Sequence, residues 1–363
     1  MKKKNVRLSF LAIDPYIESN IVRPNEKAIR GKDFISWGEN NDYPYYLDSL
    51  YNNVATLKSI IDGLTDYICG NKIIAKDTIF DEKVNKNGLD VTELVHNLAG
   101  DYARYGGFAI NVVRNRAGGI AGLYYLDFSK CRTNKDKTIV YYADDWDKSF
   151  GRVKCVEYPN FTYEPNNKST IYYFSNSHKT VYPSPLYAAA VIPCEIEKKI
   201  NEFGINLLSN GLNSNFIINF NNGLPDDDQR EEIENDIYEK FTGTENSGRP
   251  IIAWNNDKEH AVTIEKIDND AWADKYTNLQ KTSRAQIYNA FRCNPILFGI
   301  DQENTGFNSQ EYAEAFKLFN RTVVKPIQDK IKLVFDKIFE TENFLTIEPF
   351  VINFEKDTDE VEK

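Results

Sequence analysis

The amino-acid sequence predicts an α+β fold, and three observations carry this prediction. Apolar residues recur at helical spacing from Tyr45 to Cys69. Short β-branched and aromatic segments, separated by turn residues, follow between Phe108 and Phe174. Two long helical patterns then enclose a compact segment with strand signals. This order predicts helices packed on antiparallel sheet, followed by an elongated helical part.

The first part of the chain separates into an arm and a folded domain. Residues 1–42 are polar and rich in turn residues, which predicts an N-terminal arm. The apolar pattern of 45–69 predicts one helix or two, with Gly70 as the stop signal. A second pattern, from Val91 to Tyr102, predicts another helix. We therefore expect the domain of residues 43–182 to open with helices.

A change of hydrophobic period marks the strands of this domain. The segments alternate or run apolar over a few residues, with turns such as Asn115 to Gly119 between them. We interpret them as an antiparallel meander. The predicted strands are 108–114, 120–126, 138–142, 153–157 and 170–174.

Residues 183–298 predict two long helices around a small insert. A narrow apolar stripe predicts a helix within 183–211, and a second stripe predicts a helix over 270–291, within 268–298. Between them, residues 212–267 read as a β-α-β unit. Its expected elements are strands at 215–220, 250–254 and 261–267, and a helix at 226–241.

The last part of the chain combines a polar loop with one more helix. Residues 299–310 are polar and contain two glycines. A helical pattern extends from about Ser309 to Glu340, and Pro326 inside it predicts a kink. Most of this helix and the tail after it form the last predicted part of the chain, residues 311–363. The end of the chain is acidic.

Composition excludes several classes of function. The 363 residues carry a net charge of −10, so the chain lacks the overall basic character that grips nucleic acid phosphates. The five cysteines include no C-x-x-C pair, which indicates reduced thiols and argues against a zinc site or a disulfide framework. No apolar run approaches the ~18 residues of a membrane span, so we expect no membrane association. No cofactor motif is present, and we expect no cofactor.

Acidic runs are the remaining basis for catalysis. The three histidines follow no metal-binding spacing. Asp226-Asp227-Asp228 precedes a predicted helix, where acids cap free N–H groups, and Asp144, Asp145 and Asp147 flank Trp146. We favour capping and solvated acids. The alternative is a metal-dependent nucleic-acid-processing enzyme whose carboxylate clusters hold divalent ions.

A series of local motifs follows one another in a characteristic order along residues 37–340. They are Trp37–Leu47, Ile68–Gly70, Tyr105–Ile110, Ser184–Leu186, Leu208–Gly211, Gly243–Arg249, Ile287–Leu297, Asn308–Glu311 and Thr322–Pro326. In this order the chain resembles the portal proteins of tailed bacteriophages, in the HK97-type and SPP1-like portal group. There are two departures: Pro183 stands where a glycine is usual, and the short tail after Glu340 argues against a large crown domain.

The resemblance implies a structural protein rather than an enzyme. It implies a homo-oligomeric ring, a dodecamer, at one capsid vertex, with the virion as its location and the host cytoplasm as the site of assembly. Double-stranded DNA would pass through the ring during packaging and ejection, and the terminase, the major capsid protein and a head–tail adaptor would be its partners. The implied parts are a wing (43–182), a stem (183–211 and 268–298), a clip (212–267), a tunnel loop (299–310) and a C-terminal wing or crown helix with an acidic tail (311–363).

The resemblance also assigns candidate site residues. For Lys275, Lys281 and Arg284 the residues alone favour a solvated or ion-paired face, with contact to DNA phosphates as the alternative. A conduit should bind its cargo weakly, since each neutralised phosphate adds affinity. The DNA-facing candidates are Asp301, Gln302, Glu303, Asn304, Thr305 and Asn308 in the tunnel loop, and Lys275, Lys281 and Arg284 in the stem; the candidates for motor or adaptor contact are Asn222, Asp226, Asp227, Arg230 and Arg249 in the clip.

Overall fold

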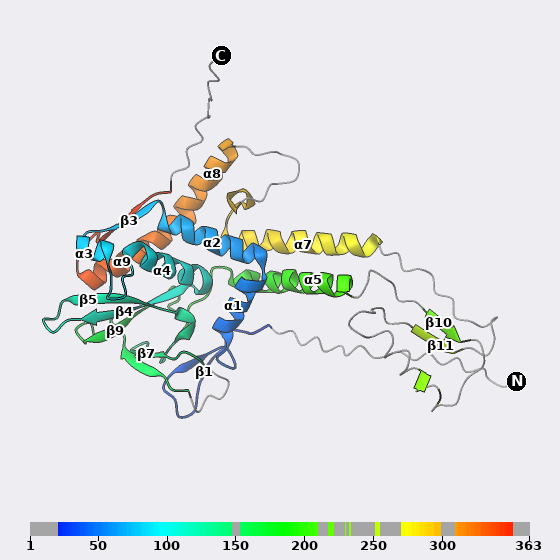
Figure 1. The fold of residues 1–363 in the computed structure, drawn as a ribbon, viewed down its shortest axis with the longest axis horizontal. Helices are drawn as coiled ribbons and strands as arrows, with labels where there is room; N and C mark the ends of the chain where they lie inside the picture. Colours follow the sequence, from blue (N-terminus) through cyan, green and yellow to red (C-terminus); the bar gives the residue numbers. More distant parts are fainter. Residues whose placement is uncertain are drawn as a thin grey trace, which may run out of the picture. The chain divides into compact units, whose positions relative to one another are not determined.

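The chain divides into two compact units in the computed structural model (Figure 1). The first lies within residues 196–282, and the second within 21–195 and 283–350. Both boundaries fall inside long helices, so each of these helices contributes to both units. The structure describes residues 21–146, 153–209, 217–220, 229, 232–233, 251–254, 270–298 and 309–350.

The helices α1, α2 and α4 contribute to the helical part of the second unit. The pattern of 45–69 becomes two helices, α1 (Tyr43–Asn53) and α2 (Ala55–Cys69), because Val54 adopts an extended conformation between them. In α4 (Val91–Tyr105), the Asp90 side chain caps the first turn by accepting from the backbone N–H of Glu93 at 2.7 Å. Apolar side chains of all three helices are buried in one core.

Two three-stranded sheets complete the mixed part. β4 (Gly107–Arg114) lies between β5 (Ile120–Leu126) and β9 (Ser169–Ser175), and β7 (Ile139–Tyr142) lies between β6 (Cys131–Thr133) and β8 (Val156–Pro159). All pairs are antiparallel, as predicted. The strands do not follow one continuous meander, because β9 returns to pair with β4. Phe108 and Phe174 face each other in that pair, with ring centroids 4.9 Å apart.

Several short elements have no clear sequence signal, because distant segments pair to form them. β1 (Glu26–Ala28) and β2 (Ile35–Trp37) form a hairpin. β3 (Lys72–Ala75) pairs with β12 (Leu345–Glu348), almost at the far end of the chain. A Cβ at Gly70, which has a φ of +65°, would lie 2.1 Å from the Glu348 carbonyl oxygen. The remaining short elements are α3 (Thr78–Glu82), η1 (Phe128–Lys130), η2 (Ala188–Ala190) and η4 (Pro295–Phe298).

The two predicted long helices are present as α5 (Val191–Ser209) and α7 (Asp270–Phe291). Between them in sequence, β10 (Ile217–Phe220) and β11 (Ile251–Trp254) pair in parallel, which requires a crossover connection. The predicted strand 261–267 lies outside the described residues. None of the helices in the described ranges is long and apolar enough to span a bilayer.

The last predicted helix is built from α8 (Ser309–Phe319), the π-helical turn η5 (Asn320–Val324) and α9 (Lys325–Phe339). In the π turn the N–H of Lys325 donates to the carbonyl of Asn320, five residues back. This wider turn comes directly before Pro326, which lacks an N–H to donate. The irregularity expected at the proline therefore takes the form of a π turn.

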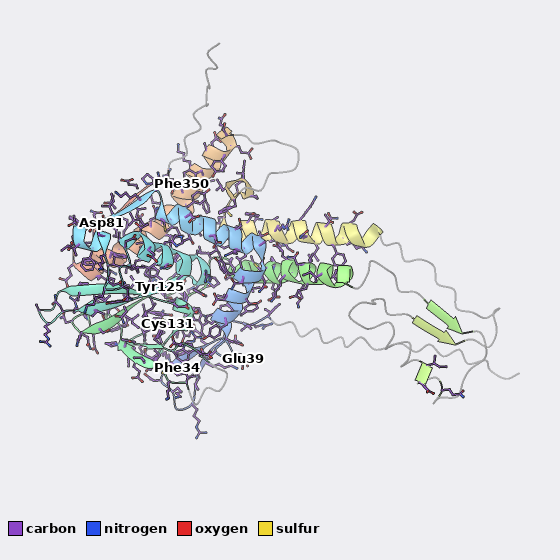
Figure 2. All side chains as sticks on the ribbon, in the orientation of Figure 1. Phe34, Glu39, Asp81, Tyr125, Cys131 and Phe350 are labelled. Atoms are coloured by element: carbon purple, nitrogen blue, oxygen red, sulfur yellow. The ribbon has the colours of Figure 1, made fainter. Side chains whose placement is uncertain are left out.

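A buried arginine fixes the start of the folded chain. Trp37 is 0% exposed and its ring stacks on Tyr182 with a centroid distance of 4.6 Å. Asn41, at a φ of +60°, accepts from the Trp37 N–H through its side chain. Arg132, also 0% exposed, donates to both the side chain and the carbonyl of Asn41. Residues 21–42 are the part of the expected arm that the structure describes, and they contribute to the core. Phe34 (Figure 2) belongs to a second, smaller cluster of buried apolar side chains.

We predict that Asn41→Ala destabilises the protein by about 2–4 kcal/mol. The left-handed conformation costs alanine about 1 kcal/mol, and the buried donors of Trp37 and Arg132 lose an acceptor, at about 1–3 kcal/mol. Asn41→Gly removes the same acceptor without the conformational cost, so it should lose about 1 kcal/mol less. Denaturant unfolding measures both variants, and equal losses would contradict the conformational contribution.

Candidate functional site

Two ring stacks show that α5 and α7 lie side by side. In the first unit, Phe203 of α5 stacks on Tyr276 of α7, with centroids 4.7 Å apart and an interplanar angle of 19°. In the second unit, Tyr187, shortly before α5, stacks on Phe291 at the end of α7, with centroids 5.5 Å apart. The start of one helix thus meets the end of the other, so the helices run antiparallel (Figure 1).

Large apolar side chains are exposed on both of these helices. Ile205 is 64% exposed and Phe203 41% exposed on α5, and Leu279 is 43% exposed on α7. Ile192, in the first turn of α5, is 58% exposed. At about 100° per residue, Phe203 and Ile205 project about 160° apart around α5, so these exposed side chains do not form one patch.

The three cationic stem candidates do not share one face of α7. Lys275, Lys281 and Arg284 are exposed, and none of them lacks an interaction partner. At about 100° per residue, Lys281 and Arg284 project about 60° apart, whereas Lys275 and Arg284 project about 180° apart. One line of phosphates could therefore meet Lys281 and Arg284 together, but not all three side chains.

The other predicted site residues lie outside the described residues. They belong to the tunnel loop and the clip, and the structure places none of them. They are Asp301, Gln302, Glu303, Asn304, Thr305 and Asn308, and Asn222, Asp226, Asp227, Arg230 and Arg249.

Asp144 and Asp145, the acids beside Trp146 that the structure describes, are not grouped with other ligands for a metal ion. The Asp144 side chain is 90% exposed and lies 3.8 Å from the Lys130 ammonium, and Asp145 is exposed. Trp146 itself is buried, and its indole N–H donates to the Lys130 carbonyl at 2.8 Å. Throughout the part of the chain that the structure describes, no three His, Cys, Asp or Glu side chains are grouped to hold a metal ion. Asp147 and Asp226 to Asp228 lie outside that part.

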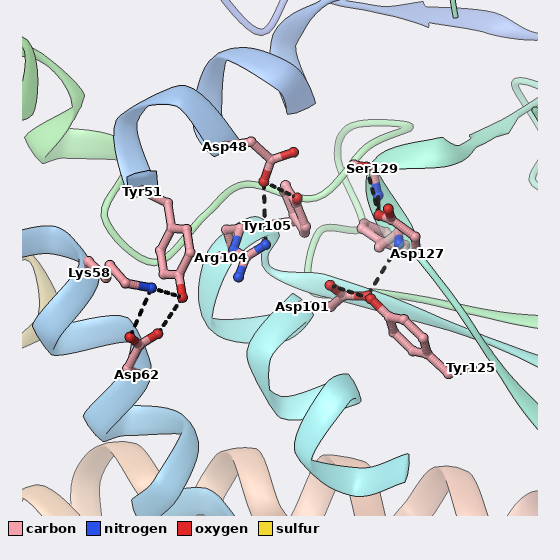
Figure 3. A network of polar contacts seen from close by, with 11 residues as sticks. Asp48, Tyr51, Lys58, Asp62, Asp101, Arg104, Tyr105, Tyr125, Asp127 and Ser129 are labelled. Carbon is pink, nitrogen blue, oxygen red and sulfur yellow. Dashed lines mark hydrogen bonds and ion pairs between the residues drawn. The ribbon is translucent and has the colours of Figure 1, made fainter. Parts of the chain in front are cut away.

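A cavity of about 390 Å³ lies among α1, α2, α4 and β5 of the second unit. A polar network surrounds it (Figure 3). Tyr51 of α1 donates to Asp62 of α2 at 2.5 Å, and the Lys58 ammonium lies 2.7 Å from the Tyr51 hydroxyl and 3.2 Å from Asp62. The guanidinium of Arg104 lies 3.9 Å from the centroid of the Tyr51 ring and donates to Asp48 at 3.4 Å.

Asp101 of α4 is the most buried carboxylate of this network. It is 4% exposed and lines the cavity. It accepts from the Tyr125 hydroxyl and from the Phe128 N–H, each at 3.2 Å. Burial, and then the charge of Asp127, raise the pKa of Asp101 well above its ordinary value. The predicted site residues do not include Asp101. An acid on the buried face of a helix, beside Leu98 and Tyr105, is a signal from which its burial could have been predicted.

Comparison with known proteins identifies the family. The family model described as "Phage portal protein" matches residues 78–360, most of the chain. The chain belongs to the phage portal protein family. The predicted resemblance is thereby confirmed, and the expected α+β fold with long helices agrees with it.

Two curated relatives of this portal chain come from rickettsiae. An uncharacterized protein of Rickettsia bellii (strain RML369-C) is 28% identical over 194 residues, which cover 52% of this chain and 48% of the relative. An uncharacterized protein of Rickettsia felis (strain ATCC VR-1525 / URRWXCal2) is 28% identical over 172 residues, covering 47% of this chain and 42% of the relative. The portal chain spans about half the length of the curated relatives it matches.

Solved structures share the fold of the portal chain. A chain from the neck of a native GTA particle, computed with C12 symmetry, has a TM-score of 0.54 at 17% identity, over 84% of this chain and 83% of that one. A chain from the neck of an empty GTA particle, computed with C6 symmetry, also has a TM-score of 0.54, at 16% identity, over 82% and 81%. At these identities the likeness establishes the fold.

We predict that Asp101→Asn changes how stability depends on pH. In the folded protein the pKa of Asp101 is raised above 3.8, its ordinary value, which applies to the unfolded chain. In the pH window between these two pKa values, the native state therefore holds a proton that the unfolded chain has lost. The free energy of unfolding of the wild type therefore falls as the pH rises through that window. The variant lacks this contribution, so its stability relative to the wild type should improve as the pH rises from acid to neutral.

Denaturant unfolding across this pH range measures the effect. Asp144→Asn removes an exposed carboxylate and is the matched control, whose curve should run parallel to that of the wild type. Parallel curves for Asp101→Asn as well would contradict the prediction.

Proposed function

We propose that this chain is the subunit of a ring-shaped portal at one vertex of a phage capsid. Double-stranded DNA passes through the ring when the genome is packaged and again when it leaves. The protein is part of the virion and assembles in the host cytoplasm. Its role is structural, and membership of the phage portal family supports this assignment over the metal-dependent enzyme.

The paired helices α5 and α7 carry the proposal. They bracket residues 212–267 in the sequence, and aromatic stacks join them at two levels. In this proposal they are the stem, residues 212–267 are the clip, and residues 43–182 are the wing. Two rigid rods held side by side give each subunit a long lateral surface for its neighbours.

Exposed apolar residues supply the contact that closes the ring. A head-to-tail contact repeated around an axis closes into a ring when its rotation fits a whole number of copies. Ile205, Phe203 and Leu279 are exposed on the stem and suit such a contact. Twelve copies are the proposed number, and the twelvefold symmetry used for the native GTA neck supports it.

Charge supports weak contact with DNA. Each phosphate that a protein neutralises adds affinity and salt dependence, and a channel that releases its cargo must limit both. The net charge of −10 does so, while Lys281 and Arg284 offer only a local positive face. In this proposal the DNA also meets the tunnel loop, 299–310.

The proposed protein partners meet different parts of the chain. The terminase and later the head–tail adaptor contact the clip, through Asn222, Asp226, Asp227, Arg230 and Arg249. The major capsid protein surrounds the wing, 43–182.

Size-exclusion chromatography with light scattering tests the proposed function. A closed ring of several hundred kilodaltons, seen as a ring in particle images viewed down its axis, supports it. A monomer that cleaves DNA in the presence of magnesium would overturn it.

We predict that Ile205→Asp reduces ring assembly by about tenfold or more. The new carboxylate would have to lose water at the subunit contact, and a cost of ~1.4 kcal/mol per contact suffices for that factor. Leu333→Asp, at a 52% exposed position on α9, is the matched control and should leave the rings intact. Light scattering measures both, and the reverse pattern would move the contact away from the stem.

We predict that deleting residues 299–308 leaves rings intact but impairs DNA packaging. The segment is polar in sequence, and in this proposal it faces the channel, so subunit contacts should not depend on it. Light scattering measures the rings, and DNA protected from nuclease inside particles measures packaging. Loss of the rings would show that the segment is structural.

A further inference from the structure

We propose that the acidic segment 351–363 of this chain docks on α8 and η5, where it occupies cations that would otherwise meet nucleic-acid phosphates. Its docking surface, here named the α8 face, consists of the exposed side chains of Lys317, Leu318 and Arg321. The segment itself lies outside the described residues. This inference goes beyond the proposed portal function.

The described chain leads into the segment directly beside the α8 face. Phe350 (Figure 2) is the last residue before the segment that the structure describes. Its ring centroid lies 5.4 Å from that of Tyr67 on α2 and 6.1 Å from that of Phe316 on α8. Phe316 directly precedes Lys317. An extended chain spans about 3.3 Å per residue, so the segment is long enough to cover the α8 face from this starting point.

The cations of the α8 face have no acidic partner in the described part of the chain. Lys317 and Arg321 are exposed and lie four residues apart, about one helical turn. None of the carboxylates that the structure describes is paired with either of them. The acid before them on α8, Glu314, accepts a hydrogen bond from Gln310 at 3.4 Å instead. Both cations are therefore available to an added acidic partner.

The segment offers the side chains that the α8 face lacks. Leu318, between the two cations in sequence, is 65% exposed and suits an apolar contact. The segment begins with a short apolar stretch and continues with five acids against two lysines. Its apolar residues are Val351, Ile352 and Phe354, its acids are Glu355, Asp357, Asp359, Glu360 and Glu362, and its lysines are Lys356 and Lys363.

Covalent continuity makes this docking effective although each contact is weak. Exposed ion pairs contribute little individually and are screened by salt. Because Phe350 holds the start of the segment beside α8, docking is an intramolecular step with a high effective concentration. A phosphate of DNA would compete for the same two cations without that advantage. The docked segment thus limits nucleic-acid affinity at the α8 face.

Trypsin digestion of the full chain tests the docking. Trypsin cuts after Lys356, and a docked segment protects that bond. The double variant Lys317→Gln, Arg321→Gln lacks both cations and should release the peptide 357–363 about threefold faster or more. Mass spectrometry follows the peptide, and circular dichroism checks that the variant is folded.

A matched double variant controls for the loss of positive charge. Lys135→Gln, Lys179→Gln removes two exposed cations from another part of the same unit and should release the peptide at the wild-type rate. Equal rates for the wild type and both double variants would overturn the proposal.

Salt and the apolar contact provide two further readouts of peptide release. At about 1 M salt the Debye length falls to about 3 Å, so the wild-type rate should approach that of Lys317→Gln, Arg321→Gln. Leu318→Gln keeps the charge of the α8 face and should also speed the release. Protection that resists both salt and Leu318→Gln would overturn the contact proposed here.

Binding of a short DNA duplex, measured by fluorescence anisotropy, distinguishes the segment from nucleic acid as the partner. Replacing the five acids of the segment by their amides should tighten DNA binding about threefold or more, and the gain should vanish when Lys317→Gln, Arg321→Gln is added. If that double variant weakens DNA binding but leaves peptide release unchanged, the α8 face is a DNA contact and the proposal is wrong. Light scattering measures ring assembly separately, so its failure is distinguishable from failure of the portal function.

Discussion

The buried guanidinium of Arg132 is the constraint on which the α+β unit depends. No carboxylate among the described residues is paired with it, and it donates to the side chain and carbonyl of Asn41 and to the carbonyls of Ser129 and Cys131. Desolvation lowers the pKa of Arg132, and these four acceptors offset the cost of burying its charge. In the sequence, Asn41 lies 91 residues from Arg132, whereas Ser129 lies only three residues away. The interaction therefore joins the segment just before α1 to β6.

The same region leads to the helix pair. Tyr182 stacks on Trp37, its hydroxyl donates to the Ile35 carbonyl, and it accepts from the Thr133 N–H at 3.2 Å. Five residues later Tyr187, 0% exposed, stacks on Phe291. The start of α5 and the end of α7 are thus anchored in the core of one unit, while Phe203 and Tyr276 hold the two helices together within the other.

Two buried charges, Arg132 and Asp101, are handled in different ways. Arg132 is surrounded by acceptors that use its donors, which makes it structural. Asp101 receives only two long hydrogen bonds and borders a cavity. Both side chains are nearly inaccessible to solvent, so the difference lies in how many hydrogen bonds each one makes.

Local signals in the sequence were enough to predict several elements. The 3.6-residue spacing of apolar side chains predicted α7 to the residue and the existence of α4 and α5, and β-branched runs predicted β4, β5 and β9. Only the tertiary structure decided which strands pair, because the partner of β3 is β12, some 270 residues away. It also decided that Asp101 borders a cavity, and that the cations of α7 project in different directions. Such properties depend on neighbours brought together by folding, which local spacing does not encode.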